Sequence, residues 1–289
     1  MKKHAFLIIA HNNFLVLSKL LDALSHPCVD IYLHIDAKVK QIPAFNLRQS
    51  QLYILQTRID TRWGDFSQIE TEYVLMETAL RHGGYAFYHI ISGTHFPLLP
   101  IERILDFFNA KEGQTVFHAL CTDTQYQEFL KVRSYNLFTR YLAFGPKAIQ
   151  KSVQILNRAG HKVQSLLGIE RNRNVTFYKA SNWASFSEEA ILMLIERKEQ
   201  VRHIFAFSYC GDEYFAPTVL MNSPLREQVS NYENYLKLEM GDANPRTLTD
   251  EDYDMLIHSN CLFARKFSDA NISLVDKITR SYPCYFLVL

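Results

Sequence analysis

The sequence has little cysteine, glycine and proline, and no excess of charge of either sign. Its cysteines are odd in number and include no C-x-x-C pair, which excludes a zinc knuckle and a dense disulfide framework. Ten glycines and nine prolines in 289 residues favour long elements with few glycine-built loops. The net charge of +1 excludes a general electrostatic footprint for nucleic acid or an anionic membrane. We expect five buried thiols in a reducing cytoplasm: Cys28, Cys121, Cys210, Cys261 and Cys284.

Long apolar runs are also missing. No segment approaches the roughly 18 apolar residues of a membrane span. The N-terminal apolar run is interrupted at His11, Asn12 and Asn13, before it gains signal-peptide character. Hydrophobic residues make up 48% and charged residues 21%, as in ordinary soluble proteins. We therefore expect a cytoplasmic globular protein with at most peripheral membrane association at the inner face.

Several functional motifs do not occur. The sequence contains no G-x-G-x-x-G, no G-x-x-x-x-G-K-[ST], no H-E-x-x-H and no G-x-S-x-G. Their absence disfavours dinucleotide oxidoreductases, P-loop NTPases, zincins and α/β-hydrolases. His4 with His11, and His34 with Asp36, have spacings that strands produce by chance, so we expect no metal site.

Short apolar runs alternate with amphipathic stretches over the first hundred residues. This order predicts an α/β fold with a mixed or largely parallel sheet flanked by helices. In such sheets, ligands bind where the strands end. The expected strands are 6–10, 30–36, 52–57 and 86–92, and the expected helices are 14–24, 67–81 and 101–109.

The middle of the chain is less regular. Its basic, aromatic stretch KVRSYNLFTRYLAFGPKAIQK is compatible with nucleic-acid binding, but the neutral net charge favours a helical insertion with a solvated face. A strand pattern returns at 176–186, followed by helices at 188–201 and near 250–259. Because no repeat or linker occurs, we expect one domain (1–289) with a smaller C-terminal lobe. Its parts are a nucleotide-binding half (1–110), a helical insertion (111–175) and an acceptor and catalytic half (176–289).

Two acidic strings and one basic pair are candidates for chemistry. Asp250-Glu251-Asp252 matches a metal-binding Asp-x-Asp, but it opens a helix after Thr249, so we favour helix capping. Asp212-Glu213 stands at a turn before an apolar helix that ends near Asn222, where it is either a helix start or a catalytic group. Arg265-Lys266 interrupts an apolar run, which indicates either an anionic ligand or a structural salt bridge.

Seven segments, in order, resemble the family of core-2/I-branching β-1,6-N-acetylglucosaminyltransferases and peptide O-xylosyltransferases. They cover nearly the whole chain outside about 114–175, and the forms WG-x-x-S, S-x-W, E-x-F-x-x-T-V-L-x-N-S and F-A-R-K-F lean toward the xylosyltransferases. The segments are IIAHNN with YLHIDAK, RWGDFSQIETEYVLMETAL, YHIISGTHFPLLPIERILDFF, SNWASFSEEAILMLI, DEYFAPTVLMNS and CLFARKF.

The resemblance implies a GT-A-like fold that binds a UDP-sugar and transfers the sugar with inversion, without a metal or other cofactor. It implies that Glu213 is the catalytic base and that Arg265 and Lys266 hold the donor diphosphate. Arg246 falls near a second diphosphate arginine of the family, across an alignment gap. The remaining implied residues are His11, Asp36, Trp63, Gly64 and Ser92 for the nucleoside and donor, and Trp183 and Asp212 for the acceptor.

The implied partners are therefore a UDP-sugar and a glycan or glycoconjugate acceptor, with xylose or N-acetylglucosamine as the transferred sugar. The sequence lacks the anchor, stem and many cysteines of eukaryotic members, so we expect a compact version that serves polysaccharide or glycoconjugate assembly. Two alternatives remain open: a non-catalytic glycan- or nucleotide-binding module, and a glycoside hydrolase that uses Asp212 or Glu213.

Overall fold

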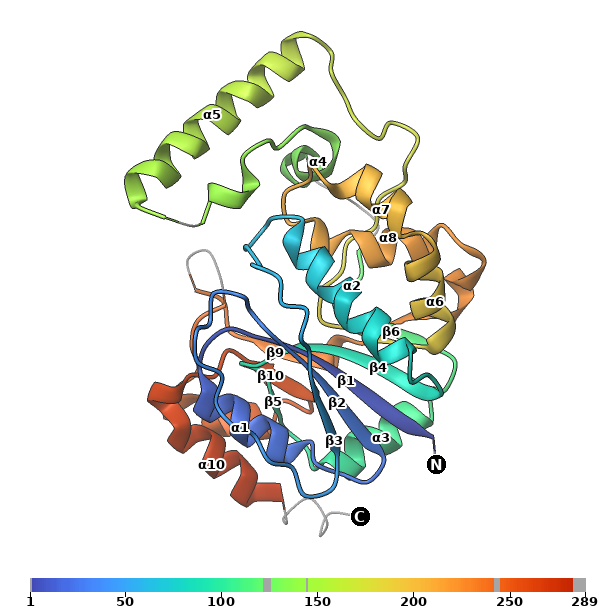
Figure 1. Cartoon of the computed structure of the whole chain (residues 1–289), viewed down its shortest axis with the longest axis vertical. Coiled ribbons are helices and arrows are strands. Elements are labelled where there is room, and N and C mark those ends of the chain that lie inside the picture. The colour runs from blue at the N-terminus through green and yellow to red at the C-terminus, as the bar shows by residue number, and fades with distance from the viewer. Residues whose placement is uncertain (1, 122–125, 144, 242–244, 283–289) are drawn as a thin grey trace.

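A seven-stranded mixed sheet lies at the centre of the structure, a computed structural model that describes residues 2–121, 126–143, 145–241 and 245–282 (Figure 1). Its strand order is β3-β2-β1-β4-β7-β6-β8. The first four strands run parallel, β7 is antiparallel to β4 and β6, and β8 is parallel to β6. The strands are β1 (Lys3–Ala10), β2 (Val29–Ile35), β3 (Gln51–Ile54), β4 (Tyr85–Ser92), β6 (Thr115–Phe117), β7 (Ser185–Phe186) and β8 (Val229–Asn231).

The parallel strands are buried because their sequences are almost continuously apolar. Every residue of β2 and of β4 is buried, as is typical of parallel strands covered on both faces. The predicted α/β fold, with helices flanking a mixed sheet, is confirmed. The four strands and three helices expected between residues 6 and 109 are all present, although β3 is shorter than its apolar run.

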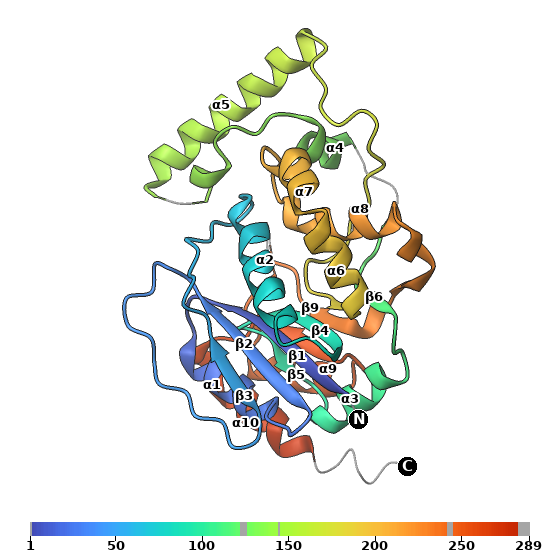
Figure 2. The same cartoon turned by 45° about the vertical axis from the view of Figure 1, so that its right-hand side comes forward.

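The helices lie in two groups around this sheet. One group includes α2, which packs on β1 and β2 and against α6; the other includes α1, which packs against α10 (Figures 1 and 2). The α-helices are α1 (Phe14–Ala23), α2 (Ser67–Leu80), α3 (Ile101–Asn109), α4 (Tyr126–Arg133), α5 (Lys147–Leu166), α6 (Glu188–Glu196), α7 (Lys198–Phe205), α8 (Phe215–Met221), α9 (Tyr253–Ile257) and α10 (Ile272–Ser281). The 3₁₀ turns are η1 (Thr139–Tyr141), η2 (Gly211–Glu213), η3 (Pro224–Gln228), η4 (Glu233–Tyr235), η5 (Asp250–Asp252) and η6 (Asp269–Asn271).

A second, three-stranded sheet brings the C-terminal part of the chain to the central one. Its order is β5-β10-β9, formed by β5 (Phe96–Pro97), β10 (Phe263–Arg265) and β9 (Leu236–Leu238). Strand β5 follows directly on the end of β4, so β10 is placed beside the carboxyl end of the central sheet.

Three expectations differ from the structure. The range 176–186 contains only the two-residue strand β7, because most of it is irregular. The helix expected over 188–201 is two helices, since Arg197 between them has non-helical dihedral angles. The range 111–175 includes β6 of the central sheet in addition to α4 and α5. Figures 1 and 2 show α5 at the end of the molecule opposite both termini.

Four of the cysteines lie in the part of the chain that the structure describes, and all four are free thiols. Cys210 and Cys261 are buried as expected, but Cys28 is half-buried and Cys121 is exposed; Cys284 lies outside the described residues. Within the described ranges, no helix has the length and apolar character needed to cross a membrane.

Candidate functional site

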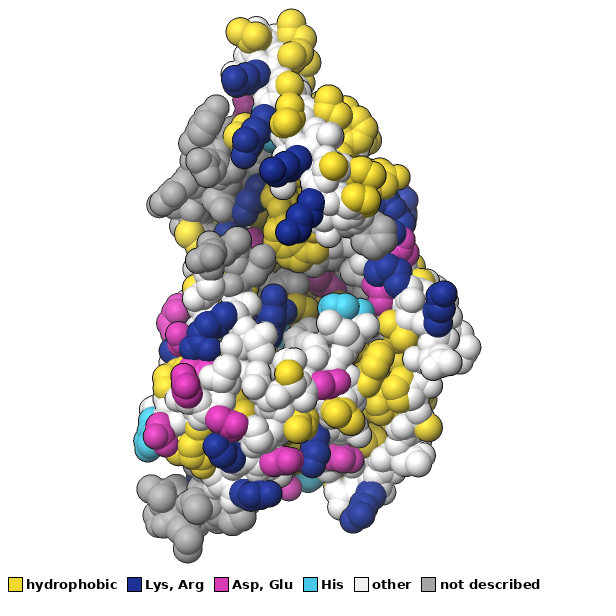
Figure 3. All heavy atoms as spheres, turned by 90° about the vertical axis from the view of Figure 1, so that its left-hand side faces the viewer, with side chains coloured by type: hydrophobic (Ala, Val, Ile, Leu, Met, Phe, Trp, Pro, Cys, Tyr) yellow, Lys and Arg dark blue, Asp and Glu magenta, His cyan; other side chains and the backbone are white. Residues whose placement is uncertain are grey.

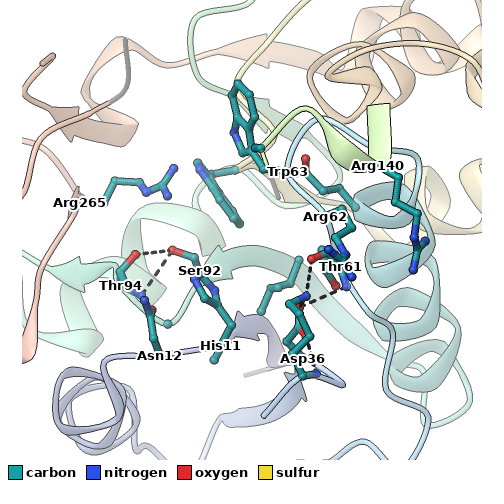
Figure 4. Close-up of a pocket in the computed structure, with 17 residues that line it drawn as sticks. His11, Asn12, Asp36, Thr61, Arg62, Trp63, Ser92, Thr94, Arg140 and Arg265 are labelled. Carbon is teal, nitrogen blue, oxygen red and sulfur yellow. Dashed lines mark hydrogen bonds and ion pairs between the residues drawn. The ribbon is translucent and has the colours of Figure 1, made fainter. Parts of the chain in front are cut away.

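A cavity of about 290 Å³ opens where β1, β2 and β4 end (Figure 4). The register pairs Ala10 with Ile35 and Ile9 with Ser92, so the three strands end at one edge of the sheet. This is where the predicted parallel sheet was expected to bind a ligand. The lining residues are Ile9, Ala10, His11, Asn12, Asp36, Lys38, Thr61, Arg62, Trp63, Gln68, Ser92, Gly93, Thr94, Arg140, Ala143, Trp183 and Arg265.

Asp36 forms one corner of the cavity, directly after β2. Its carboxylate accepts hydrogen bonds from the Lys38 backbone N–H (2.8 Å), the Lys38 ammonium (2.7 Å) and the Thr61 N–H (3.2 Å). The loop that carries Thr61 is held further by Arg58, which donates to the carbonyl oxygens of Ile35 (2.9 Å) and Asp36 (2.6 Å). The buried carboxylate is therefore fixed by its neighbours before any ligand arrives.

Three cations of the cavity wall share one carboxylate, Asp60. Its oxygens contact the Lys38 ammonium at 2.8 Å and the guanidinium groups of Arg62 at 2.7 Å and Arg140 at 2.8 Å. The hydrogen bond from Arg62, followed by the interactions with Lys38, holds the pKa of Asp60 well below its usual range. Each of these three cations therefore has a carboxylate partner within the protein, and Asp36 is a second partner of Lys38.

Arg265 differs from these cations, because it has no carboxylate partner among the described residues. Its guanidinium carbon lies 4.8 Å from the ring centroid of the buried Trp183, in cation–π geometry, and its Nε is buried without a hydrogen-bond partner. Burial lowers the pKa of Arg265 to about 10, so the group stays charged at neutral pH. The half-buried Lys266 beside it also has no ion pair within the described ranges, and burial and the charge of Arg265 lower its pKa. Figure 4 shows Arg265 reaching into the cavity from the side opposite Arg140.

The segment around Arg265 is held by the backbone on both sides. Ala264 pairs with Phe96 of β5, and the Phe267 N–H donates to the Thr94 carbonyl at 3.0 Å. The Lys266 carbonyl accepts from the Leu248 N–H at 2.9 Å. Phe263, Ala264 and Phe267 are fully buried around the pair. The apolar residues of FARKF therefore anchor the strand and leave its two cations beside the cavity.

The carboxyl end of β4 supplies a hydroxyl pair to the cavity floor. Ser92 Oγ lies 3.0 Å from Thr94 Oγ1 and 2.8 Å from Nδ1 of the buried His95. Between these hydroxyl residues, Gly93 approaches β1 so closely that an added Cβ would lie 2.9 Å from the Cβ of Ala10. The exposed His11 lies at the cavity rim after β1; desolvation and the nearby cations Lys38, Lys266 and Arg265 lower its pKa, and Asp36 opposes them.

The two carboxylates of η2 have different surroundings. Asp212 is buried, accepts from Gln68 Nε2 at 3.0 Å and leaves its Oδ1 without a partner. Desolvation, then the charge of Glu213, raises the pKa of Asp212 to about 7, and desolvation likewise raises that of the fully buried Glu72. Glu213 is half-buried, and its Oε2 lies 3.4 Å from the Lys179 ammonium. Since Gln68 lines the cavity, η2 stands directly behind that part of the wall.

The WG segment links this wall to η2. Trp63 is half exposed, lines the cavity and contacts Tyr209 edge-on, with ring centroids 5.6 Å apart. Gly64 has φ +73°, and a Cβ there would lie 2.5 Å from Cε2 of Tyr209. Its carbonyl accepts from the Cys210 N–H at 2.9 Å. Gly64 thus permits the close packing that joins the cavity wall to the carboxylate turn.

The structure brings together six of the residues expected at the site: His11, Asp36, Trp63, Ser92, Trp183 and Arg265. Trp183, which was expected on the acceptor side, lies under Arg265 in this same cavity. Lys266 and Glu213 do not line the cavity. Lys266 follows the wall residue Arg265 in the sequence, and Glu213 follows Asp212, the hydrogen-bond partner of the wall residue Gln68.

Three further expected site residues do not line the cavity either. Arg246 is not among the lining residues, because its guanidinium is engaged by both oxygens of Asp252, at 2.8 and 2.5 Å. Gly64 supports the wall through its backbone instead of lining it. Asp212, expected to contact the acceptor, is buried against Gln68.

Sequence reasoning missed several wall residues. They include Asn12, Thr61, Arg62, Gln68 and Thr94, which lie within or beside segments that carry the family resemblance. For Asn12 and Thr94, the position just after a strand was the available signal. Arg140 and Ala143 come from the middle stretch that could not be aligned. They reach the wall because Thr139 Oγ1 donates to Asp65 at 2.9 Å and Arg140 pairs with Asp60.

The acidic string after Thr249 acts as a helix cap, as expected. Thr249 and Asp252 form a reciprocal capping box at η5, while Asp250 pairs with Lys277 at 3.1 Å. Across the residues that the structure describes, no group of three or more His, Cys, Asp or Glu side chains is arranged to hold a metal ion.

Comparisons with known proteins bear on the family of this chain. No protein with a curated description matches the sequence. Among solved structures, 4-diphosphocytidyl-2C-methyl-D-erythritol synthase from Anaerococcus prevotii aligns over 96% of this chain and 97% of its own, with 13% identity and a TM-score of 0.39. A likeness that remote supports no conclusion about function.

The model of the Core-2/I-Branching enzyme family matches residues 4–251. These residues include Glu213 and all the strand ends of the cavity, while Arg265 and Lys266 lie beyond them. The match spans well over half of the 289 residues. The chain therefore belongs to the Core-2/I-Branching enzyme family of glycosyltransferases.

Proposed function

We propose that the protein transfers xylose or N-acetylglucosamine from a UDP-sugar to a hydroxyl group of a glycan or glycoconjugate, with inversion and without a divalent metal ion. The observation that carries this proposal is the pair Arg265 and Lys266, which has no acidic partner among the described residues and stands at the ligand edge of an α/β sheet. A nucleotide diphosphate has the charge and size to complete such a pair.

The two cations supply what the leaving group needs. As the bond between the anomeric carbon and the β-phosphate oxygen breaks, its electron pair remains on UDP and the diphosphate gains negative charge. Arg265 is already desolvated and held over Trp183, so it stabilises this charge without reorganising. Lys266 adds a second cation one residue away. In this proposal, the uridine occupies the part of the cavity near His11 and Asp36.

Glu213 is the proposed general base. Its carboxylate takes the proton of the acceptor hydroxyl as that oxygen attacks the anomeric carbon from the face opposite UDP, which inverts the configuration. The half-buried position of Glu213 keeps it reachable by an acceptor, and its Oε2 lies 3.4 Å from the Lys179 ammonium. Asp212 has the opposite character, since it is buried and has a raised pKa.

The hydrolase alternative needs two carboxylates that face one sugar. Asp212 turns toward Gln68 and Glu213 toward Lys179, so the pair does not meet this requirement. We place the reaction in the cytoplasm, within glycoconjugate or polysaccharide assembly. The free thiols among the described cysteines support that location.

A thermal-shift panel of UDP-xylose, UDP-N-acetylglucosamine, UDP-glucose and UDP-galactose tests the donor. Ligand binding to the folded state raises its stability according to affinity. We expect one or both of the first two to give the largest shift in the presence of EDTA, and a much smaller shift in Arg265→Met. Equal responses of parent and variant to every nucleotide would contradict the assignment of the diphosphate site.

A further inference from the structure

Helix α5 carries a stripe of large apolar side chains that faces away from the protein. Ile149, Leu156, Val163 and Leu167 follow one another at intervals of seven, seven and four residues, and Ile155 and Leu166 stand beside them. These six side chains are between 48% and 86% exposed. Val153 is the helix residue that is buried. An exposed apolar face of this kind marks an interaction surface more often than a solvated one.

The contacts of α5 explain why this face points outward. Its polar side is held to the segment before it: Gln164 accepts from the Tyr135 N–H at 2.7 Å and donates to the Tyr135 carbonyl at 3.1 Å, and His161 Nε2 lies 3.1 Å from Asn136 Oδ1. The helix therefore uses amide and imidazole groups to attach itself and leaves about half or more of each side chain in its apolar stripe exposed.

A second stripe along the helix is cationic. Lys147, Lys151, Arg158 and Lys162 recur at intervals of four, seven and four residues, and the twenty residues of α5 include no Asp or Glu. Figure 3 shows, toward the α5 end of the molecule, Lys and Arg side chains in a column beside apolar ones. The near-neutral net charge of +1 conceals this local concentration. A helix with apolar side chains flanked by cations is typical of segments that lie in a membrane interface.

We propose that α5 docks the protein on an anionic lipid surface, with its apolar stripe inserted among the acyl chains and its four cations beside the lipid headgroups. The charge complementarity argues for anionic lipid as the partner. A nucleic acid would use the cations but not the apolar stripe, and a second copy of the chain would bring like-charged stripes together. The segment before α5 also contributes Arg140 to the cavity, so the docked surface adjoins the proposed active site.

The test is flotation of the full chain with vesicles of phosphatidylcholine alone or with phosphatidylglycerol, at low and high salt. One variant combines Lys151→Gln, Arg158→Gln and Lys162→Gln; a second combines Ile155→Gln, Leu156→Gln and Val163→Gln. Since each cation near an anionic surface contributes about fivefold to binding, the first variant should bind on the order of 100-fold more weakly. The second should also lose binding.

The control variant combines Arg48→Gln, Arg81→Gln and Arg280→Gln, which removes three exposed charges from other regions and should bind like the parent. Circular dichroism and thermal melting check that each variant folds. If the apolar triple variant does not fold, Leu166→Gln replaces it, because that side chain is 86% exposed.

Four outcomes would overturn the proposal. They are absence of binding to anionic vesicles, unchanged binding by the apolar variant, a dimer in solution that the apolar variant disperses without any vesicle binding, and duplex DNA binding in place of vesicle binding. Binding to the anionic vesicles that falls with salt and is lost in both α5 variants, but not in the control, would support it.

Discussion

Replacement of Arg265 by methionine should make the protein more stable and nearly inactive. Burial lowers the pKa of Arg265 from 12.5 to about 10, which corresponds to a cost of about 3 kcal/mol for holding the charge in the folded state. A basic group whose pKa is lowered by folding destabilises the folded state at every pH at which it is protonated in that state. The full cost is therefore present at neutral pH.

Removing the buried charge would relieve this cost, but it would also remove the stabilising cation–π contact with Trp183. Such a contact contributes about 1–2 kcal/mol when desolvated, and methionine can replace part of it through its own packing against the ring. The net expectation is that Arg265→Met raises the free energy of unfolding by about 1–2 kcal/mol. The melting temperature should then rise by a few degrees, since about 2–4 °C per kcal/mol is typical of chains near this size.

Turnover should change in the opposite direction. Loss of one preorganised partner of the leaving group costs on the order of 100- to 1000-fold in rate. The assay is UDP release with the preferred donor, in parallel with denaturant and thermal unfolding without ligand. Arg48→Met is the control, because Arg48 is exposed and outside the cavity; it should change neither quantity. A variant that is both less stable and fully active would refute the reasoning.

Three further predictions concern the carboxylate turn and its support. Glu213→Gln should lower kcat by about 10²- to 10⁴-fold while the thermal shift with UDP stays unchanged, and full activity in UDP-release assays would remove the base assignment. Because the folded pKa of Asp212 is raised to about 7, the stability of the parent should fall as pH rises from about 4 to 7. Between pH 5 and pH 8 this loss is about 3 kcal/mol, and Asp212→Asn should abolish most of it when unfolding is compared at those two pH values. Gly64→Ala should destabilise by about 1–3 kcal/mol more than Gly84→Ala, since both positions have φ +73° but only the former places a Cβ against Tyr209, and equal melting temperatures would contradict this.

Local pattern was enough to predict the central sheet. The strands VDIYLHI and YAFYHIIS are largely apolar, and amphipathic helical stretches alternate with the strands, so a parallel sheet and its ligand edge follow from general rules. Capping by the acidic string after Thr249 was predictable for the same reason, because a capping box depends on residues three apart.

The arrangement of the site depends on contacts that no local pattern contains. Arg265 lies over Trp183, 82 positions earlier, because the second sheet brings β10 to the end of β4. The burial of Asp212 depends on Gln68, in a helix 144 positions away. The resemblance assigned roles to these residues, but it could not show which of them share a cavity. Arg246 is an example, since its partner Asp252 holds it outside the cavity wall.

The most direct test of the proposed function is the initial rate of UDP release from the preferred UDP-sugar, with an acceptor, in excess EDTA and in added magnesium or manganese. We predict equal rates in the two conditions, and a rate at least 100-fold lower in EDTA when Arg265→Met and Lys266→Met are combined. A reaction that stops in EDTA, resumes with the metal ion and persists in the double variant would contradict the account.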